Sequence, residues 1–273
     1  MATEIATEPK PVTRAGEPRR GRLSGVVLPI LGVLIALAVW WGATELFDIQ
    51  PIILPAPDQV LSAFTALQTE LLTQTWNTTT AVVLGFGASV VVGVLLGAAI
   101  AASRPIERMF QPLLVAFNAV PKVALAPLLL IWLGYGRTPV LAMAFMVCFF
   151  PIVLATAVGL TSTPADLAEL ARSMDASRGQ IFRWIRLPAA LPQIFVGFRI
   201  AMPLAVIGVV VGEMQYGETG LGMIIVQTSG QADTASAFAA IVLLSLVSVA
   251  LYYVLVLIER LVLPWVRATT SAR

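Results

Sequence analysis

The sequence contains no histidine, one cysteine and only two lysines among its 273 residues. The missing histidine removes the side chain that most often transfers protons near neutral pH and binds transition metals. The single Cys148 excludes an intrachain disulfide and a cysteine-based metal site. We therefore predict that this chain binds no metal ion and no cofactor.

A P-loop is also absent. That motif requires Gly-Lys-Ser/Thr, whereas the two lysines stand in PKPV and PKVA. Any ATP and Mg²⁺ would have to be used by a partner subunit, so we expect that the chain itself is not an enzyme.

Charged residues are scarce as well. They make up 12% of the chain, against about a quarter in soluble domains, and 58% of the residues are hydrophobic. A membrane-spanning helix needs roughly 20 mainly apolar residues. Six stretches approach or exceed that length: Ser24 to Phe47, Thr79 to Ala102, Met109 to Leu133, Thr138 to Leu160, Ile194 to Gly212 and Ala237 to Ile258. We predict an all-α, polytopic membrane protein with six transmembrane helices.

The distribution of Lys and Arg predicts the orientation, because these residues mark the cytoplasmic side. Residues 1–23 contain five of them, 103–108 two, 169–192 four and 259–273 three, whereas the loops between these segments contain only Arg137. The alternation predicts a multi-pass protein of the plasma (inner) membrane with both termini in the cytoplasm. Because these residues account for the net charge of +2, we predict no nucleic-acid partner.

The spans form one predicted domain. We divide the chain into a disordered basic arm (1–23), a six-helix transmembrane domain (24–265) with a cytoplasmic loop (161–193), and a cytoplasmic tail (266–273). The loops 48–78 and 213–236 contain acids but no Lys or Arg, so they are predicted to face outward.

The third stretch contains prolines and a lysine at membrane depth. Irregular backbone survives there only where protein or a water-filled cavity covers it, and an intramembrane lysine usually faces a pathway or a partner. Our candidates for the translocation pathway are Pro121, Lys122, Pro127 and Glu213. The alternative is that the prolines kink a packed helix while Lys122 snorkels or pairs within the bundle, for instance with Glu213.

The segment ELARSMDASRGQIFRWIRLPAALP (169–192) interrupts this apolar chain with four arginines. Thr163 as N-cap and Pro164 at the first helical position predict a helix with one apolar face. MDAS then breaks the pattern, and a second short helix, Gln180 to Leu187, is expected to end at Pro188 and Pro192. Such a pair of helices could lie on the membrane, pack on its own bundle or dock into a partner's groove.

This segment resembles the EAA loop of permease subunits of binding-protein-dependent ABC importers. The residues that match or occupy its motif positions are Glu169, Leu170, Ala171, Met174, Asp175, Ile181, Leu187 and Pro188. Leu170 departs from the usual alanine, and Asp175 stands where relatives carry the glycine of a sharp turn. LPAPDQV (54–60), PKVALAPLLLIWLGYG (121–136), GEMQYGETGLG (212–222) and ERLVLPW (259–265) resemble segments of the nitrate/sulfonate/taurine-type branch.

The resemblance implies the type I ABC importer (MetI-like) permease fold. It also implies docking of the loop on a dimer of ABC ATPase subunits, a solute-binding protein on the outer side, and a second copy of the chain. For the substrate we favour a nitrate-, sulfonate- or taurine-like anion. A thiamine-precursor pyrimidine or riboflavin is the alternative. A stand-alone secondary carrier or a membrane-bound enzyme would lack coupling or catalytic groups, because the central parts of the spans contain no Asp or Glu.

Overall fold

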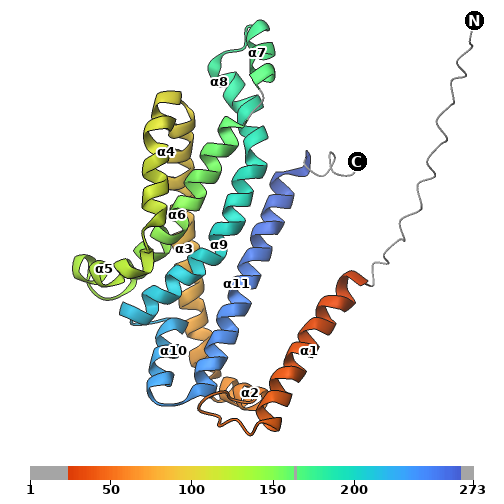
Figure 1. Ribbon diagram of the computed structural model, residues 1–273, viewed down its shortest axis with the longest axis vertical. Coiled ribbons are helices and arrows are strands. Elements are labelled where there is room, and N and C mark those ends of the chain that lie inside the picture. Colours follow the sequence, from red (N-terminus) through yellow and green to blue (C-terminus); the bar gives the residue numbers. More distant parts are fainter. Residues whose placement is uncertain (1–23, 163–164, 266–273) are drawn as a thin grey trace, which may run out of the picture. The chain divides into compact units, whose positions relative to one another are not determined.

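The computed structural model describes residues 24–162 and 165–265, and every regular element in these ranges is a helix (Figure 1). The chain divides into two units, up to Ile49 and from Gln50 onward, and each is considered by itself. The first contains helix α1 (Ser24–Leu46), within which Ile30–Leu46 is an apolar stretch shorter than the candidate spans described below. The predicted arm, the N-cap at Thr163 with Pro164, and the predicted tail lie outside the described residues.

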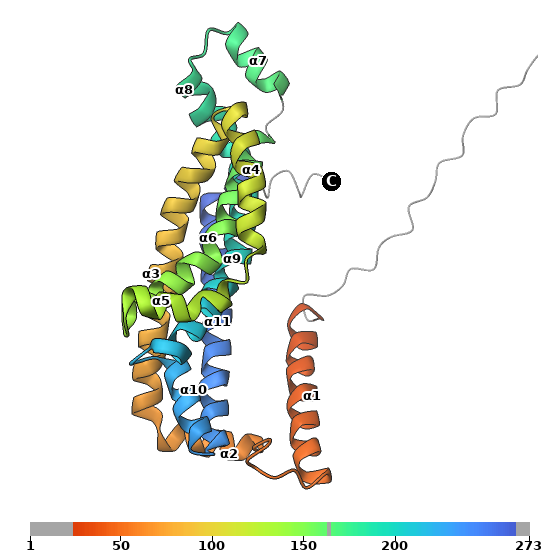
Figure 2. The ribbon, with the colours of Figure 1, turned by 60° about the vertical axis from the view of Figure 1, so that its left-hand side comes forward.

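In the described part of the second unit, four helices are long and apolar enough to cross a membrane (Figures 1 and 2). They are α3 (Gln68–Ala101), α6 (Arg137–Thr161), α9 (Leu187–Tyr216), which continues a helical run from Arg178, and α11 (Thr234–Val262). Helix α6 packs against both α3 and α9 and supplies the centre of the core, where Met143, Ala144 and Cys148 are fully buried.

Glycines bring these helices close together. A Cβ at Gly85 of α3 would lie 2.6 Å from the Cβ of Ala144, and one at Gly208 of α9 would lie 2.8 Å from the Cα of the same residue. Gly93 and Gly97 also face α6, whereas Gly87 has open space beside it. Small residues that permit close approach are typical of helix pairs in membranes.

The third predicted span is not one kinked helix. It is broken into α4 (Arg104–Ala119), a 3₁₀ turn η1 (Lys122–Leu125) and α5 (Ala126–Leu133), with a bend of 77° between its two parts. Val120 is extended, as expected for a residue that precedes proline, and Pro121 cannot donate a backbone hydrogen bond. The described residues thus contain four candidate spans, or five if this bent pair is counted.

Several predicted boundaries are wrong. Helix α3 begins at Gln68 rather than Thr79, a further helix α2 (Pro57–Ala66) precedes it, and α10 (Leu221–Gly230) lies in the predicted outer loop.

The prolines after the arginine-rich segment do not end its second helix, contrary to what the sequence predicted. The helical run continues through Pro188 and Pro192. A π turn, η2 (Phe182–Arg186), makes this possible, because its wider hydrogen bonds, such as Leu187 N–H to the Phe182 carbonyl, lie next to the prolines.

Candidate functional site

The loop with the arginines forms two short helices that project beyond the ends of α3 and α6 (Figure 2). They are α7 (Ala165–Ser173) and α8 (Arg178–Ile181). Ser177 caps α8, since its hydroxyl accepts from Gln180 N–H and the Gln180 amide oxygen accepts from Ser177 N–H. This capping box sets where the second helix begins.

Asp175 makes the turn between the two helices in a left-handed conformation, with φ of 64°. The Asp175 N–H donates to the carbonyl of Arg172 and the Ala176 N–H to that of Ala171, both at 3.0 Å. These are the two bonds of a Schellman C-cap, whose left-handed residue is usually glycine. The turn that glycine would give is therefore present with aspartate in its place.

The predicted coupling residues separate into an exposed group and a buried base. Glu169, Leu170, Met174 and Asp175 are exposed, whereas Ile181 is buried and Ala171, Leu187 and Pro188 are half-buried. The exposed members belong to α7 and its turn, and the covered ones lie mainly where the loop joins α9. The loop is therefore packed where it joins α9, and its outer helix α7 is exposed.

Lys122 lies at the break between α4 and α5. Its ammonium donates to the carbonyl oxygen and to Oδ1 of Asn118, each at 3.0 Å, and lies 5.3 Å from the ring centroid of Phe150. Among the described residues Lys122 forms no ion pair with Glu213. The pairing that the sequence left open is therefore not formed. The flanking Pro121 and Pro127 are exposed.

Glu213 lies one turn before the end of α9 and is only 3% exposed. Thr78 of α3 donates its hydroxyl to Oε1 at 2.8 Å and to Oε2 at 3.0 Å, and the Gly222 N–H donates to Oε2 at 2.9 Å. The Thr78 oxygen in turn accepts from the Leu221 N–H. The carboxyl group therefore fastens α9 to α3 and to the first turn of α10.

The segment between α9 and α10 is wrapped closely around this carboxyl group. The Gly220 N–H donates to Oε1 of Gln74 at 2.7 Å. Gly220 has φ of 109°, and a Cβ there would overlap the Glu213 carboxyl group. The sequence pointed to Glu213 but not to Gln74 and Thr78, which stand four residues apart on one face of α3. The sequence signal that could have found them is that both are polar residues directly before the apolar stretch of α3.

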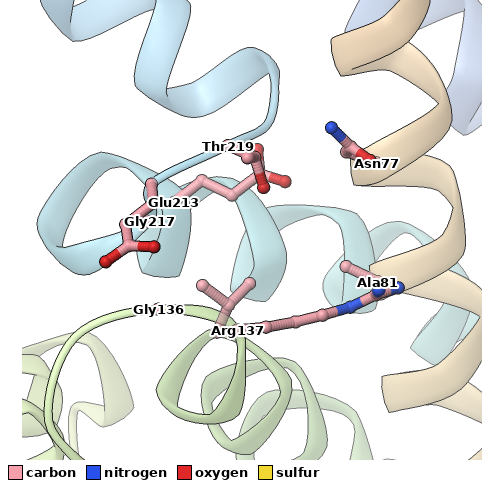
Figure 3. Close-up of a pocket in the computed structure, with 9 residues that line it drawn as sticks. Asn77, Ala81, Gly136, Arg137, Glu213, Gly217 and Thr219 are labelled. Carbon is pink, nitrogen blue, oxygen red and sulfur yellow. The ribbon is translucent and has the colours of Figure 1, made fainter.

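A cavity of about 110 Å³ adjoins Glu213. Figure 3 shows Asn77, Arg137, Glu213 and Thr219 among the residues around it. Arg137 reaches from the first turn of α6 to α3, where its guanidinium donates to the Thr80 hydroxyl at 2.8 Å. Polar side chains and apolar residues such as Ala81 and Val140 line the cavity together, and it has room for water.

A partly buried ion pair joins α9 to α11 toward the loop end of the helices. Arg199 contacts the carboxylate of Glu259, and their side chains are 37% and 15% exposed.

We expect Arg199→Glu or Glu259→Arg alone to lower the free energy of unfolding by about 2 kcal/mol, because each leaves two like charges together. The double exchange should recover at least half of that loss in detergent unfolding experiments. Losses that simply add would show that the pair contributes nothing.

Comparison with known proteins identifies the family. Residues 89–268 match the model described as "Binding-protein-dependent transport system inner membrane component". The riboflavin transport system permease protein RibX of Chloroflexus aurantiacus is 37% identical, with 93% of this chain and 97% of the relative covered. The formylaminopyrimidine transport permease protein ThiX of Halalkalibacterium halodurans is 34% identical, with coverages of 87% and 95%. The taurine transport system permease protein TauC of Escherichia coli is 29% identical, with coverages of 88% and 90%.

A solved structure shows the same fold. The inward-facing MetNI methionine ABC transporter matches with a TM-score of 0.60 and 22% identity, covering 73% of this chain and 97% of the matched chain. The chain therefore belongs to the binding-protein-dependent transport system inner membrane components, and is the permease subunit of an ABC importer rather than its ATPase.

Proposed function

We propose that this chain, paired with a second copy, forms the membrane channel of an ATP-driven importer that receives its solute from an extracytoplasmic binding protein. Two ATPase subunits would bind at the α7–α8 end and use the ATP and Mg²⁺. The observation that carries this proposal is the protruding helical loop within the matched region. Six spans, with α1 as the first and both termini in the cytoplasm, are part of the proposal.

Exposed apolar side chains support docking of the α7–α8 loop into a groove. Leu167, Leu170, Met174 and Trp184 are between 47% and 76% exposed, although the loop is rich in charge. Large apolar groups exposed together mark interaction sites, and an amphipathic helix is suited to a groove. ATP-driven closure of the ATPase dimer would move this loop and, through α9, the channel.

Asp175 provides a test of the coupling loop. Asp175→Val should lower ATP-dependent uptake about tenfold, because a β-branched residue at φ of 64° adds about 1 to 2 kcal/mol of strain to the turn. Asp175→Gly is the matched control and should keep full uptake, since glycine adopts this conformation freely. Uptake and ATP hydrolysis are measured in proteoliposomes with the ATPase and the binding protein. Full coupled activity in the valine variant would contradict the proposal.

For the substrate we propose a flat nitrogen heterocycle of the riboflavin or pyrimidine type. The two relatives at 37% and 34% identity carry such names. Phe117 stacks on Phe150 beside Lys122, with ring centroids 6.1 Å apart, so the helix break presents aromatic rings. Rings of this kind stack well on planar solutes. We propose that Pro121, Lys122, Pro127 and Glu213 lie along or next to the pathway.

A small anion is the second candidate, because the taurine relative at 29% and the nitrate import permease protein NrtB of Synechocystis at 28% also cover most of the chain. The experiment compares uptake of radiolabelled riboflavin, formylaminopyrimidine, taurine and nitrate by the reconstituted complex. We expect uptake of one of the two heterocycles to exceed that of both anions at least tenfold. Uptake of taurine or nitrate without either heterocycle would reverse the assignment.

A further inference from the structure

Three arginines of the protruding loop converge on one hollow. Arg172, Arg178 and Arg186 line a cavity of about 640 Å³ together with Phe182 and with Ala102, the residue that follows α3. Among the residues that the structure describes, no acidic side chain lines it. The hollow therefore combines three positive charges with an apolar wall, at the level where a candidate membrane span ends.

These guanidinium groups have no partner within the described ranges 24–162 and 165–265. The ion pair found in these ranges joins Arg199 to Glu259, and no side-chain hydrogen bond from the three arginines is found there. The fourth arginine of the loop differs, because Arg183 lies over the Trp184 ring at 5.8 Å and does not line the hollow. Guanidinium groups bind phosphate oxygens in a paired, directional way, so three unpaired ones in a hollow favour a phosphate-bearing ligand.

The position of the hollow favours a lipid over the ATPase partner. The apolar side chains suited to docking, Met174 and Trp184, line a different hollow, of about 370 Å³. Ala176 and Ile181 are shared by the two, so the arginine hollow lies on the other side of this wall, next to the end of α3. Basic pockets at the cytoplasmic ends of spans, where the proposed function places this loop, are typical sites for anionic lipid headgroups.

We propose that the hollow bounded by Arg172, Arg178, Arg186, Phe182 and Ala102 binds the phosphate headgroup of an anionic phospholipid. The headgroup would lie among the three guanidinium groups, and Phe182, which is 42% exposed, would contact the glycerol and upper chain carbons. The lipid would thereby hold the loop against the end of α3. This site does not depend on which solute is carried or on which ATPase binds.

Lipid retention by the purified full-length permease tests the proposal. The protein is placed in phosphatidylcholine nanodiscs with phosphatidylglycerol added in steps, and bound phosphatidylglycerol is measured by native mass spectrometry after release. Each of Arg172→Gln, Arg178→Gln and Arg186→Gln should weaken retention about fivefold, and the triple variant roughly a hundredfold. Arg183→Gln is the matched control and should retain the lipid as the wild type does. Circular dichroism checks that all variants remain folded.

Three results would overturn the proposal. Equal retention by the triple variant and the control would show that the arginines do not bind the headgroup. Displacement of the lipid by millimolar inorganic phosphate would show that the site takes a free anion. Loss of ATPase binding in the triple variant, with lipid retention unchanged, would assign the hollow to the partner subunit.

Discussion

Glu213→Ala is expected to lower the free energy of unfolding by about 3 kcal/mol. The substitution leaves the Thr78 hydroxyl and the Gly222 N–H without their acceptor in a buried position, and buried donors that lose an acceptor cost roughly 1 to 3 kcal/mol each. Helix α10 should separate from α3 first. Hydrogen exchange at Leu221 and Gly222 would therefore rise before global unfolding, which is followed by thermal denaturation in detergent.

Two matched variants define the origin of that loss. Glu213→Gln keeps an acceptor for Thr78 and should lose about half as much. Glu218→Ala removes an exposed acid that lines the same cavity and should change stability by less than about 0.5 kcal/mol. If Glu213→Ala and Glu218→Ala proved equally mild, the carboxyl group would not be the anchor of this end of the molecule.

The second large effect is expected at Gly208. Gly208→Ala should lower the free energy of unfolding by about 2 kcal/mol, because its Cβ would lie 2.8 Å from the Cα and 3.2 Å from the backbone nitrogen of Ala144. Backbone atoms inside a helix cannot move aside, so α6 and α9 must separate, and overpacking of this kind costs about 1 to 3 kcal/mol. Thermal unfolding of the purified permease measures the change.

Other glycines supply the controls. Gly87→Ala has open space and should gain up to about 1 kcal/mol from helix propensity. Gly85→Ala meets the Cβ of Ala144, so Ala144→Gly should rescue it. The same change should not rescue Gly208→Ala, where the contact is with backbone. Rescue of both variants, or of neither, would mean that the helices do not meet in this way.

The helical class and the membrane character were predictable because they depend on local composition. Long apolar stretches select helices that satisfy their own backbone hydrogen bonds in lipid, and α6 was located within one residue at each end. Helix ends in polar sequence were harder, since α3 extends eleven residues beyond its predicted start through a polar segment. Where the residues of a helix are polar, the hydrophobic pattern no longer shows where that helix begins or ends.

The charged segment that forms α7 and α8 was predictable for a related reason. Its amphipathic spacing and its charge are sequence properties, and two helices form there. The second begins at Arg178 rather than Gln180 and continues through a π turn into α9. Asp175 stands where the family carries glycine, and the structure forms the turn there with two backbone hydrogen bonds. Such bonds lie within six residues, so a sequence motif contains most of what is needed to predict them.

The sequence by itself determined that this is a helical membrane protein with a charged, amphipathic loop. Only the tertiary structure decided which groups meet. Thr78 reaches Glu213 across 135 positions, and Ala144 is held between Gly85 and Gly208. The physical reason is that hydrogen bonds and close packing act over a few ångströms. Their partners are therefore selected by how the helices lie against one another, which no stretch of neighbouring residues specifies.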